Sequence, residues 1–246
     1  METVPGKYSY NSWPLGQLPD SWKRPEPELI RNKGYSWQDP RDIVDIFEVK
    51  LAKYAGSKFA AVLDCDSHAL FLSLKFLDFK GEVSIPSRTY ASVPMQILHA
   101  GASFSFRDEA WHGKYELKGT GIFDAAAQFK PGMFDSDSLI QTLSFQIKKV
   151  LPIGRGGAIL TNSKEVYDWI KLSSYDGRDL TSRYDSPGHI KSLGWHYYMT
   201  PEDAARGILL MDDLSEDRLF ELGWANYPDL REYEFFKKNS TGSENR

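Results

Sequence analysis

Apolar residues recur along the middle of the chain at intervals that alternate between strand-like and helix-like. The run Phe59–Leu63 has the length of a buried strand, and leucines at helical spacing follow it as far as Leu77. Two more strands are predicted at Glu82–Pro86 and Gly101–Phe106, with a helix over Ser92–Ala100 between them. Strands that alternate with helices are typical of an α/β fold. We therefore predict a three-layer sandwich in which helices cover both faces of a mostly parallel central sheet.

Helix and strand signals on either side of this region complete the predicted domain. Asp39 and Pro40 are typical of the first turn of a helix, and Gly56 predicts its end. The remaining predicted elements are short strands at 122–123, 143–145 and 158–161, and helices that begin at Ser163 and Thr200. Residues 39–214 are thus assigned to one α/β domain.

The two ends of the chain lack this regular pattern. Residues 1–38 contain prolines, which forbid a long helix, and aromatic side chains, which favour burial against another surface. We predict an irregular arm that wraps over the body or over a partner subunit, and a loosely ordered tail is the alternative that the sequence leaves open. The last residues, 237–246, are polar and are predicted to be disordered.

Composition excludes several classes of function. The formal net charge of −4 provides no basic field for a nucleic acid or an anionic membrane. The single cysteine, Cys65, rules out an intrachain disulfide and fits a reducing compartment. No apolar run approaches the length of a membrane span, and the first residues lack the features of a signal peptide. We predict a cytoplasmic protein that binds neither nucleic acid nor membrane and has no metal site.

Chemically useful side chains follow several of the predicted strands. Asp66, Tyr90, Asp124 and Lys149 each come shortly after a strand, and ligands of α/β sheets bind beyond the carboxyl ends of the strands. We therefore expect these side chains to share one site. Burial against apolar backbone lowers the pKa of a lysine and makes it a competent imine former. Taken alone, however, the pair Lys148 and Lys149 is better explained by the surface of a hairpin.

The polar turn Asp64–Ser67 stands between a strand and the start of a helix. Such a turn is a natural seat for a phosphate group, because the first N–H groups of a helix have no partner within it. Two aspartates in this turn repel anions, and simple helix capping explains the local pattern better.

Several short motifs occur in a fixed order between Ile43 and Leu214. They are Pro86-Ser87-Arg88-Thr89-Tyr90, Asp124-Ala125-Ala126, Ser144-Phe145, a lysine five residues after the serine, Gly154-Arg155-Gly156-Gly157, Thr161-Asn162 and Gly194-Trp195-His196-Tyr197-Tyr198-Met199. As a set they resemble the DegT-like sugar-nucleotide aminotransferases, which are pyridoxal-phosphate enzymes of the fold type I superfamily. The chain looks like a short, compact member, with residues 215–236 as a reduced C-terminal small domain.

The resemblance implies a cofactor, pyridoxal 5′-phosphate, and a role for each matching residue. Lys149, and not Lys148, would be the catalytic lysine that forms the internal aldimine. Asp124 would keep the ring nitrogen protonated, so that the ring can accept electrons. Tyr90 would stack on the cofactor ring.

The resemblance also implies which residues hold the phosphate and how many subunits form the site. Asp66, Ser67 and Ser144 would lie at the phosphate, and Gln128 stands one place beyond the position of a family glutamine or histidine. His196 matches a family asparagine that reaches the phosphate from the neighbouring subunit. The expected assembly is a homodimer with an active site shared between subunits.

The implied function is transfer of an amino group from glutamate or glutamine to a keto sugar carried by a nucleotide. The alternative is a degenerate, non-transaminating protein of the same fold that binds pyridoxal phosphate or a sugar nucleotide. The charge of Asp66 and the short C-terminal part favour this alternative, whereas Lys149 and Asp124 oppose it. A sugar dehydratase is disfavoured, because family members of that kind replace the lysine.

Overall fold

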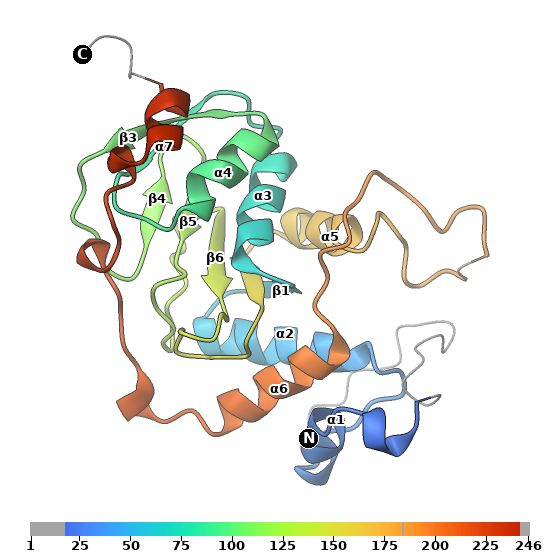
Figure 1. The fold of residues 1–246 in the computed structure, drawn as a ribbon. Helices are drawn as coiled ribbons and strands as arrows, with labels where there is room; N and C mark the ends of the chain where they lie inside the picture. The colour runs from blue at the N-terminus through green and yellow to red at the C-terminus, as the bar shows by residue number, and fades with distance from the viewer. Residues whose placement is uncertain (1–17, 184, 242–246) are drawn as a thin grey trace.

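The central sheet has five strands in the order β1-β7-β6-β5-β4 (Figure 1). Its strands are β1 (Phe59–Leu63), β4 (Tyr115–Leu117), β5 (Ile122–Asp124), β6 (Ile140–Ser144) and β7 (Gly157–Thr161). The computed structural model describes residues 18–183 and 185–241. All predicted strands are present within a few residues of their expected bounds, and β4 was not predicted.

Strand directions in this sheet differ from the prediction. Only β5 and β6 are parallel, whereas β1–β7, β6–β7 and β4–β5 are antiparallel pairs. No helix lies between β4 and β7 along the chain, and antiparallel neighbours need only a turn or a loop to connect them. The sheet is therefore mixed, and the prediction of a mostly parallel sheet is not confirmed.

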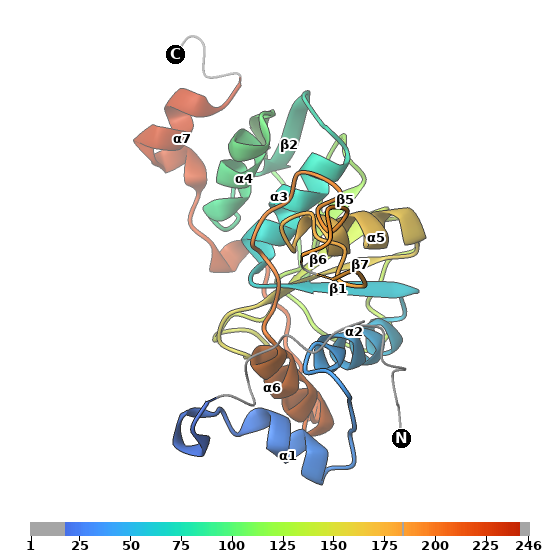
Figure 2. The same ribbon diagram turned by 90° about the vertical axis from the view of Figure 1, so that its right-hand side faces the viewer.

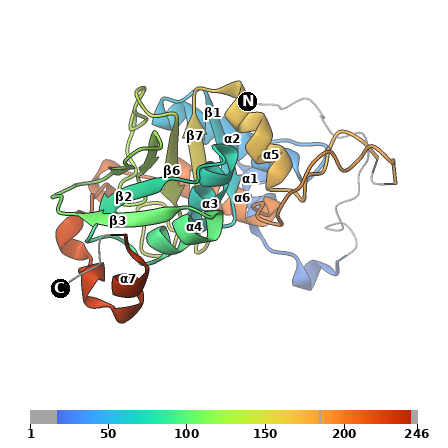
Figure 3. The same ribbon diagram turned by 90° about the horizontal axis from the view of Figure 1, so that it is seen from above.

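A second, two-stranded parallel sheet extends this arrangement. It consists of β2 (Glu82–Pro86) and β3 (Ser103–Arg107), which run side by side with the helix α4 (Ser92–Ala100) as their crossover (Figure 3). The Lys118 backbone N–H donates to the Ser84 carbonyl at 3.0 Å, which joins β2 to the region of β4. This strand–helix–strand unit is the one that the alternating pattern predicted.

Helices cover both faces of the central sheet (Figures 1 and 2). One face carries α2 (Asp42–Ala55) and α6 (Pro201–Asp212), and the other carries α3 (Asp66–Phe76) and α5 (Lys164–Ser173). Adjacent residues of β7 point to opposite faces, so Ile159 joins one apolar core and Leu160 joins the other. Each buried side chain of this size contributes about 1.5–3 kcal/mol. The three-layer α/β architecture is thus as predicted.

Capping side chains end or begin the helices where the sequence indicated. Ser163 Oγ accepts a hydrogen bond from the Val166 N–H, and Thr200 Oγ1 accepts one from the Asp203 N–H. Gly56 ends α2 with φ of 84°, a conformation that favours glycine.

The start of α2 is later than predicted. The helix begins at Asp42, because the carboxylate of Asp39 binds the backbone N–H and the guanidinium of Arg41 and so holds a turn at this point. Asp39 and Pro40 precede the helix instead of opening it.

The predicted N-terminal arm is described from residue 18 onward. It contains a single turn, η2 (Asp20–Trp22), and a short helix, α1 (Glu26–Asn32), which lies against α6 (Figure 2). Arg24 pairs with Asp203 at 2.6 Å across this contact. Residues 1–17, with Trp13, lie outside the described residues.

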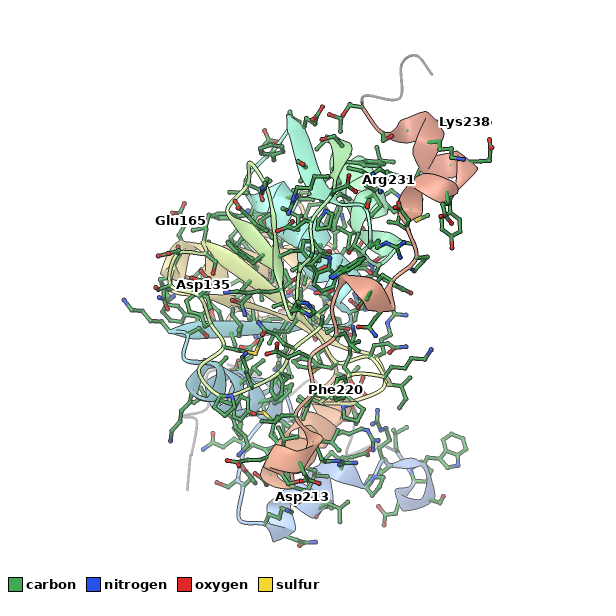
Figure 4. The ribbon with its side chains drawn as sticks, turned by 90° about the vertical axis from the view of Figure 1, so that its left-hand side faces the viewer. Asp135, Glu165, Asp213, Phe220, Arg231 and Lys238 are labelled. Carbon is green, nitrogen blue, oxygen red and sulfur yellow. The ribbon has the colours of Figure 1, made fainter. Side chains whose placement is uncertain are left out.

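After α6 the chain runs along one side of the molecule toward its opposite end. It passes through η3 (Glu216–Arg218), η4 (Trp224–Asn226) and η5 (Leu230–Glu232) to α7 (Glu234–Asn239). Asp213, Phe220 and Lys238 mark this path in Figure 4. The Thr241 N–H donates to the Phe104 carbonyl of β3 at 2.8 Å. The prediction of disorder for 237–246 is therefore wrong for residues 237–241, because α7 packs on β3; residues 242–246 lie outside the described range.

Among the helices that the structure describes, none is long and apolar enough to cross a membrane.

Candidate functional site

A cavity of about 750 Å³ opens beyond the carboxyl ends of β1, β2, β5 and β6. The residues after these strands line it, and they include Asp66, Ser67, Tyr90, Asp124, Ser144 and Lys149. The structure thus brings together the four side chains, after four different strands, that we expected to share a site. A volume of this size is typical of sites for small molecules.

Asp124 ends β5 at the floor of the cavity and is almost completely buried. Its Oδ2 accepts a hydrogen bond from the Tyr115 hydroxyl at 2.6 Å, and its Oδ1 accepts one from the Ala126 N–H at 2.9 Å. Burial raises the pKa of the Asp124 carboxyl, while these two hydrogen bonds and the charge of Lys149 act in the opposite direction. Both oxygens are therefore fixed in orientation by the protein.

Asp66 is the first residue of α3, and its carboxyl faces the same floor. Its Oδ1 is buried and has no hydrogen-bond partner within the described part of the chain. Burial and the nearby negative charge of Asp124 raise the pKa of Asp66 to about 8. Burial and the charge of Asp124 outweigh the Thr142 hydroxyl and the charge of Lys149, which act in the opposite direction, so the protonated form of Asp66 is favoured at neutral pH.

This difference predicts how stability depends on pH. An unfolded aspartate ionises near pH 4, whereas folded Asp66 keeps its proton up to about pH 8. Between these values the folded state binds more protons, so the free energy of unfolding falls as the pH rises. Between pH 5 and pH 7, the free energy of unfolding of the wild-type protein should fall by about 2 kcal/mol more than that of the variant Asp66→Asn. Urea unfolding at the two pH values measures this difference.

The matched control for this measurement is Asp137→Asn, which removes one carboxylate from an exposed position. Its stability should follow the wild-type pH dependence. Parallel curves for the wild type and Asp66→Asn would show that Asp66 is ionised in the folded protein.

Lys149 lies in the loop after β6, with its side chain half-buried in the cavity wall. No hydrogen bond or ion pair to another described residue engages its Nζ, although its charge acts on both Asp66 and Asp124. Lys148 is exposed and also borders the cavity. An amine without a protein partner, facing a buried carboxylate, is available for reaction with a ligand.

The N-terminus of α3 is open toward the cavity, because Cys65 at its N-cap makes no side-chain capping bond. The hydroxyl groups of Ser67 and Ser144 line the cavity beside it. A Cβ atom at Gly157 would lie only 2.4 Å from the backbone nitrogen of Asp66, so glycine is required for α3 to approach β7 this closely. The Gly-Arg-Gly-Gly turn therefore positions this helix end, which can bind an anion.

Charged side chains form a cluster at the rim of the cavity. Asp64 pairs with His68 at 2.6 Å and with Arg155 at 3.0 Å, and the His68 ring stacks on Tyr197. Burial opposes the charge of His68, but hydrogen bonds to Asp64 and Cys65 raise its pKa to about 9. Asp64, Cys65 and His68 have the residue types of a metal site, yet a protonated imidazole and a guanidinium disfavour a cation there.

Two predicted site residues do not reach the cavity. Gln128 is buried, and its side chain packs where a Cβ of Gly113 would be, 2.6 Å from its Oε1. His196 is 63% exposed in its side chain and pairs with Asp176 at 2.8 Å. Neither residue lies in the cavity lining, so the structure does not place them at a ligand bound by this chain.

Other lining residues were missed by the sequence analysis. Tyr115 holds Asp124, and burial raises the pKa of Tyr115 well above its usual value, so its hydroxyl stays a donor. Trp111 packs against Tyr115 with ring centroids 4.8 Å apart. Tyr227 and its neighbours come from the C-terminal segment. Trp111 precedes β4 and Tyr115 lies in it, and this strand was not predicted. No local sequence pattern connects Tyr227 with this site.

A model of the DegT/DnrJ/EryC1/StrS aminotransferase family matches residues 32–111 and 127–219. Among curated proteins, the chain is similar to the spore coat polysaccharide biosynthesis protein SpsC of Bacillus subtilis (strain 168), with 25% identity over 82% of this chain. That match covers 65% of SpsC, so the chain spans less than two thirds of the length of this relative.

Two solved structures illustrate the similarity of fold. DesI, determined in the presence of its TDP-sugar product, gives a TM-score of 0.59 and 21% identity over 77% of this chain and 57% of DesI. NtdA from Bacillus subtilis, with bound cofactor PMP, gives a TM-score of 0.61 and 19% identity over 77% of this chain and 52% of NtdA. At these identities the likeness shows that the chain has this fold.

Proposed function

Because the chain belongs to the DegT/DnrJ/EryC1/StrS aminotransferase family, we propose that it is a pyridoxal-phosphate-dependent aminotransferase. Its substrate is a keto sugar linked to a nucleotide, and glutamate or glutamine is the amino donor. The observation that carries the proposal is the pair Lys149 and Asp124: an amine with no partner among the described residues and a buried carboxylate line one cavity. Aminotransferases of this family depend on pyridoxal phosphate, and the cavity offers the groups that such a cofactor needs.

The residues present fit the cofactor at both ends. The open N-terminus of α3 and the hydroxyl groups of Ser67 and Ser144 can hold a phosphate group. Asp66 does not oppose this, because its raised pKa of about 8 keeps it neutral at pH 7. At the other end, the fixed carboxylate of Asp124 can hold a protonated ring nitrogen. Tyr90 is 64% exposed at the cavity mouth, where its ring can cover a flat ligand.

The protein contributes orientation and proton transfer to the reaction. Pyridoxal phosphate, when bound, supplies a conjugated ring that accepts the electron pair released at the amino-bearing carbon. Lys149 would provide the amine that holds the cofactor covalently and then moves the proton at its Nζ. The Tyr115 hydroxyl and the Ala126 N–H fix both oxygens of Asp124 and favour its ionised form, in which it could hold a protonated ring nitrogen.

A second copy of the chain is part of the proposal. His196 is exposed and cannot serve the cavity of its own chain, which fits a contribution to the site of a neighbour. Sedimentation of the protein as a monomer alone would contradict this shared site.

The proposal is tested by the absorbance spectrum of the protein mixed with pyridoxal phosphate, before and after addition of L-glutamate. We expect a visible band of lysine-bound cofactor that bleaches on addition of the donor. A band that ignores both glutamate and glutamine would favour the non-transaminating alternative. The absence of any band would contradict the enzyme function.

A further inference from the structure

The C-terminal segment 222–230 forms one wall of the cavity. Leu222, Asn226, Tyr227 and Pro228 line it together with Asp124 and the residues that follow the strands. The family model ends at residue 219, so this wall lies outside the part of the chain that the family match describes. Its role therefore has to be derived from its own contacts.

Backbone hydrogen bonds fix the segment on the body of the protein. The Leu222 N–H donates to the Ala127 carbonyl at 2.9 Å, beside Asp124, and the Leu230 N–H donates to the Ser87 carbonyl at 2.9 Å. The guanidinium of Arg88 also donates to the Tyr227 carbonyl at 3.1 Å. A wall bound at both ends and in the middle has a defined shape before any ligand enters.

Aromatic side chains connect this wall with the floor of the cavity. The ring of Tyr227 packs against Trp111, with centroids 5.5 Å apart, and Trp111 packs against Tyr115. The Trp111 Nε1–H donates to the Arg88 carbonyl at 2.9 Å, which fixes the indole in place. Tyr115 in turn donates to Asp124. The position of Tyr227 is thus set by the same packed side chains that hold the catalytic carboxylate.

The Tyr227 hydroxyl is a donor without an acceptor in the described part of the chain. Burial, together with the negative charges of Asp124 and Asp66, raises the pKa of Tyr227 to about 12, so it stays protonated. Asn226 Oδ1 accepts the Gly223 N–H at 2.8 Å, which leaves the amide nitrogen of Asn226 as its group for a ligand. An aromatic surface flanked by neutral donors suits a polyhydroxylated ring better than a charged one.

We propose that segment 222–230 is the substrate-side wall of the active site and that the Tyr227 hydroxyl donates a hydrogen bond to the sugar of a nucleotide-linked substrate. This inference rests on the proposed function for the class of substrate, and it adds a specificity-determining residue that lies outside the family match. The residues after the strands, which would hold the cofactor, line the same cavity.

The test separates binding of sugar from binding of cofactor. Titration calorimetry with dTDP-glucose and with UDP-N-acetylglucosamine would be carried out on the wild type, Tyr227→Phe and the control Tyr233→Phe. The control removes a phenol oxygen three residues beyond this segment, at an exposed side chain outside the cavity lining. Pyridoxal phosphate affinity would be measured by absorbance on the same three proteins.

We expect Tyr227→Phe to bind the tighter of the two probes about 3- to 10-fold more weakly, the loss typical of one neutral hydrogen bond. Its affinity for pyridoxal phosphate should stay within about twofold of wild type, and Tyr233→Phe should match the wild type throughout. Unchanged binding of the probe by Tyr227→Phe, or an equal loss for cofactor and probe, would overturn the inference. So would a wild-type protein that binds neither probe.

The outcome is distinguishable from failure of the proposed function. If no band of bound cofactor forms but the probes still bind in a Tyr227-dependent way, the aminotransferase function is wrong and the sugar-binding wall stands.

Discussion

Replacing Lys149 with alanine should abolish the visible band of lysine-bound cofactor and lower the rate of amino transfer about 10³-fold or more. The amine is the only group of this side chain that can hold the cofactor covalently and carry a proton, and alanine supplies neither function. The fold should persist, because no hydrogen bond or ion pair to the described residues engages Lys149 Nζ and its backbone turn to Gln146 can be kept. Absorbance and circular dichroism of the same preparation measure both effects.

Lys148→Ala is the matched control, since this lysine is adjacent, exposed and also borders the cavity. It should keep the band. If the band survived in Lys149→Ala and disappeared in Lys148→Ala, the catalytic role would belong to the neighbouring residue. If both variants kept it, neither lysine would hold the cofactor.

Local signals predicted the elements whose ends are set by nearby residues. Gly56, Ser163 and Thr200 act through their own conformation or through bonds to residues three positions away, so the sequence alone locates them. The buried strand β1 was also predicted from local sequence, because a short apolar run before a polar turn is typical of a buried strand. Asp39 misled the prediction because its carboxylate binds Arg41 instead of capping the helix.

The same local signals did not predict the directions of the strands. Alternating strands and helices predict parallel neighbours, but the chain from β4 to β7 contains no helix, and its loops allow antiparallel pairing. The strand β4 has only three residues, Tyr115–Leu117, and is defined by its pairing with β5, which local sequence does not encode.

The site residues that directly follow strands could be predicted from the sequence, whereas those contributed by the distant C-terminal segment could not. Asp66, Tyr90, Asp124 and Lys149 share a cavity because the topology gathers the strand ends. The charge of Asp66 looked incompatible with a phosphate, but burial of its carboxyl beside Asp124 raises its pKa to about 8 and so favours the neutral form. Tyr227 lines the same cavity although it comes more than a hundred positions after Asp124 in the sequence. Long-range packing, not pattern, places it there.

The second large effect is expected for Asp124→Asn, which should lower the rate of amino transfer about 10²- to 10³-fold. An amide has no negative charge with which to keep the ring nitrogen protonated, so the ring accepts electrons less well. Binding of the cofactor should persist, because the phosphate would be held at the N-terminus of α3 and the covalent bond by Lys149. Single-turnover bleaching of the bound cofactor by L-glutamate measures the rate directly.

Tyr115→Phe provides the graded comparison, because it keeps the Asp124 carboxylate and removes the hydrogen bond to its Oδ2, together with the hydrogen bond between Tyr115 and Thr89. That bond lowers the pKa of Asp124, so its loss should raise this pKa further and shift the acid limb of the pH–rate profile to higher pH. The rate of Tyr115→Phe should therefore recover as the pH rises, whereas the rate of Asp124→Asn should not. Near-normal turnover of Asp124→Asn would mean that Asp124 serves packing alone. An unshifted profile for Tyr115→Phe would mean that the carboxylate keeps its charge without the hydroxyl.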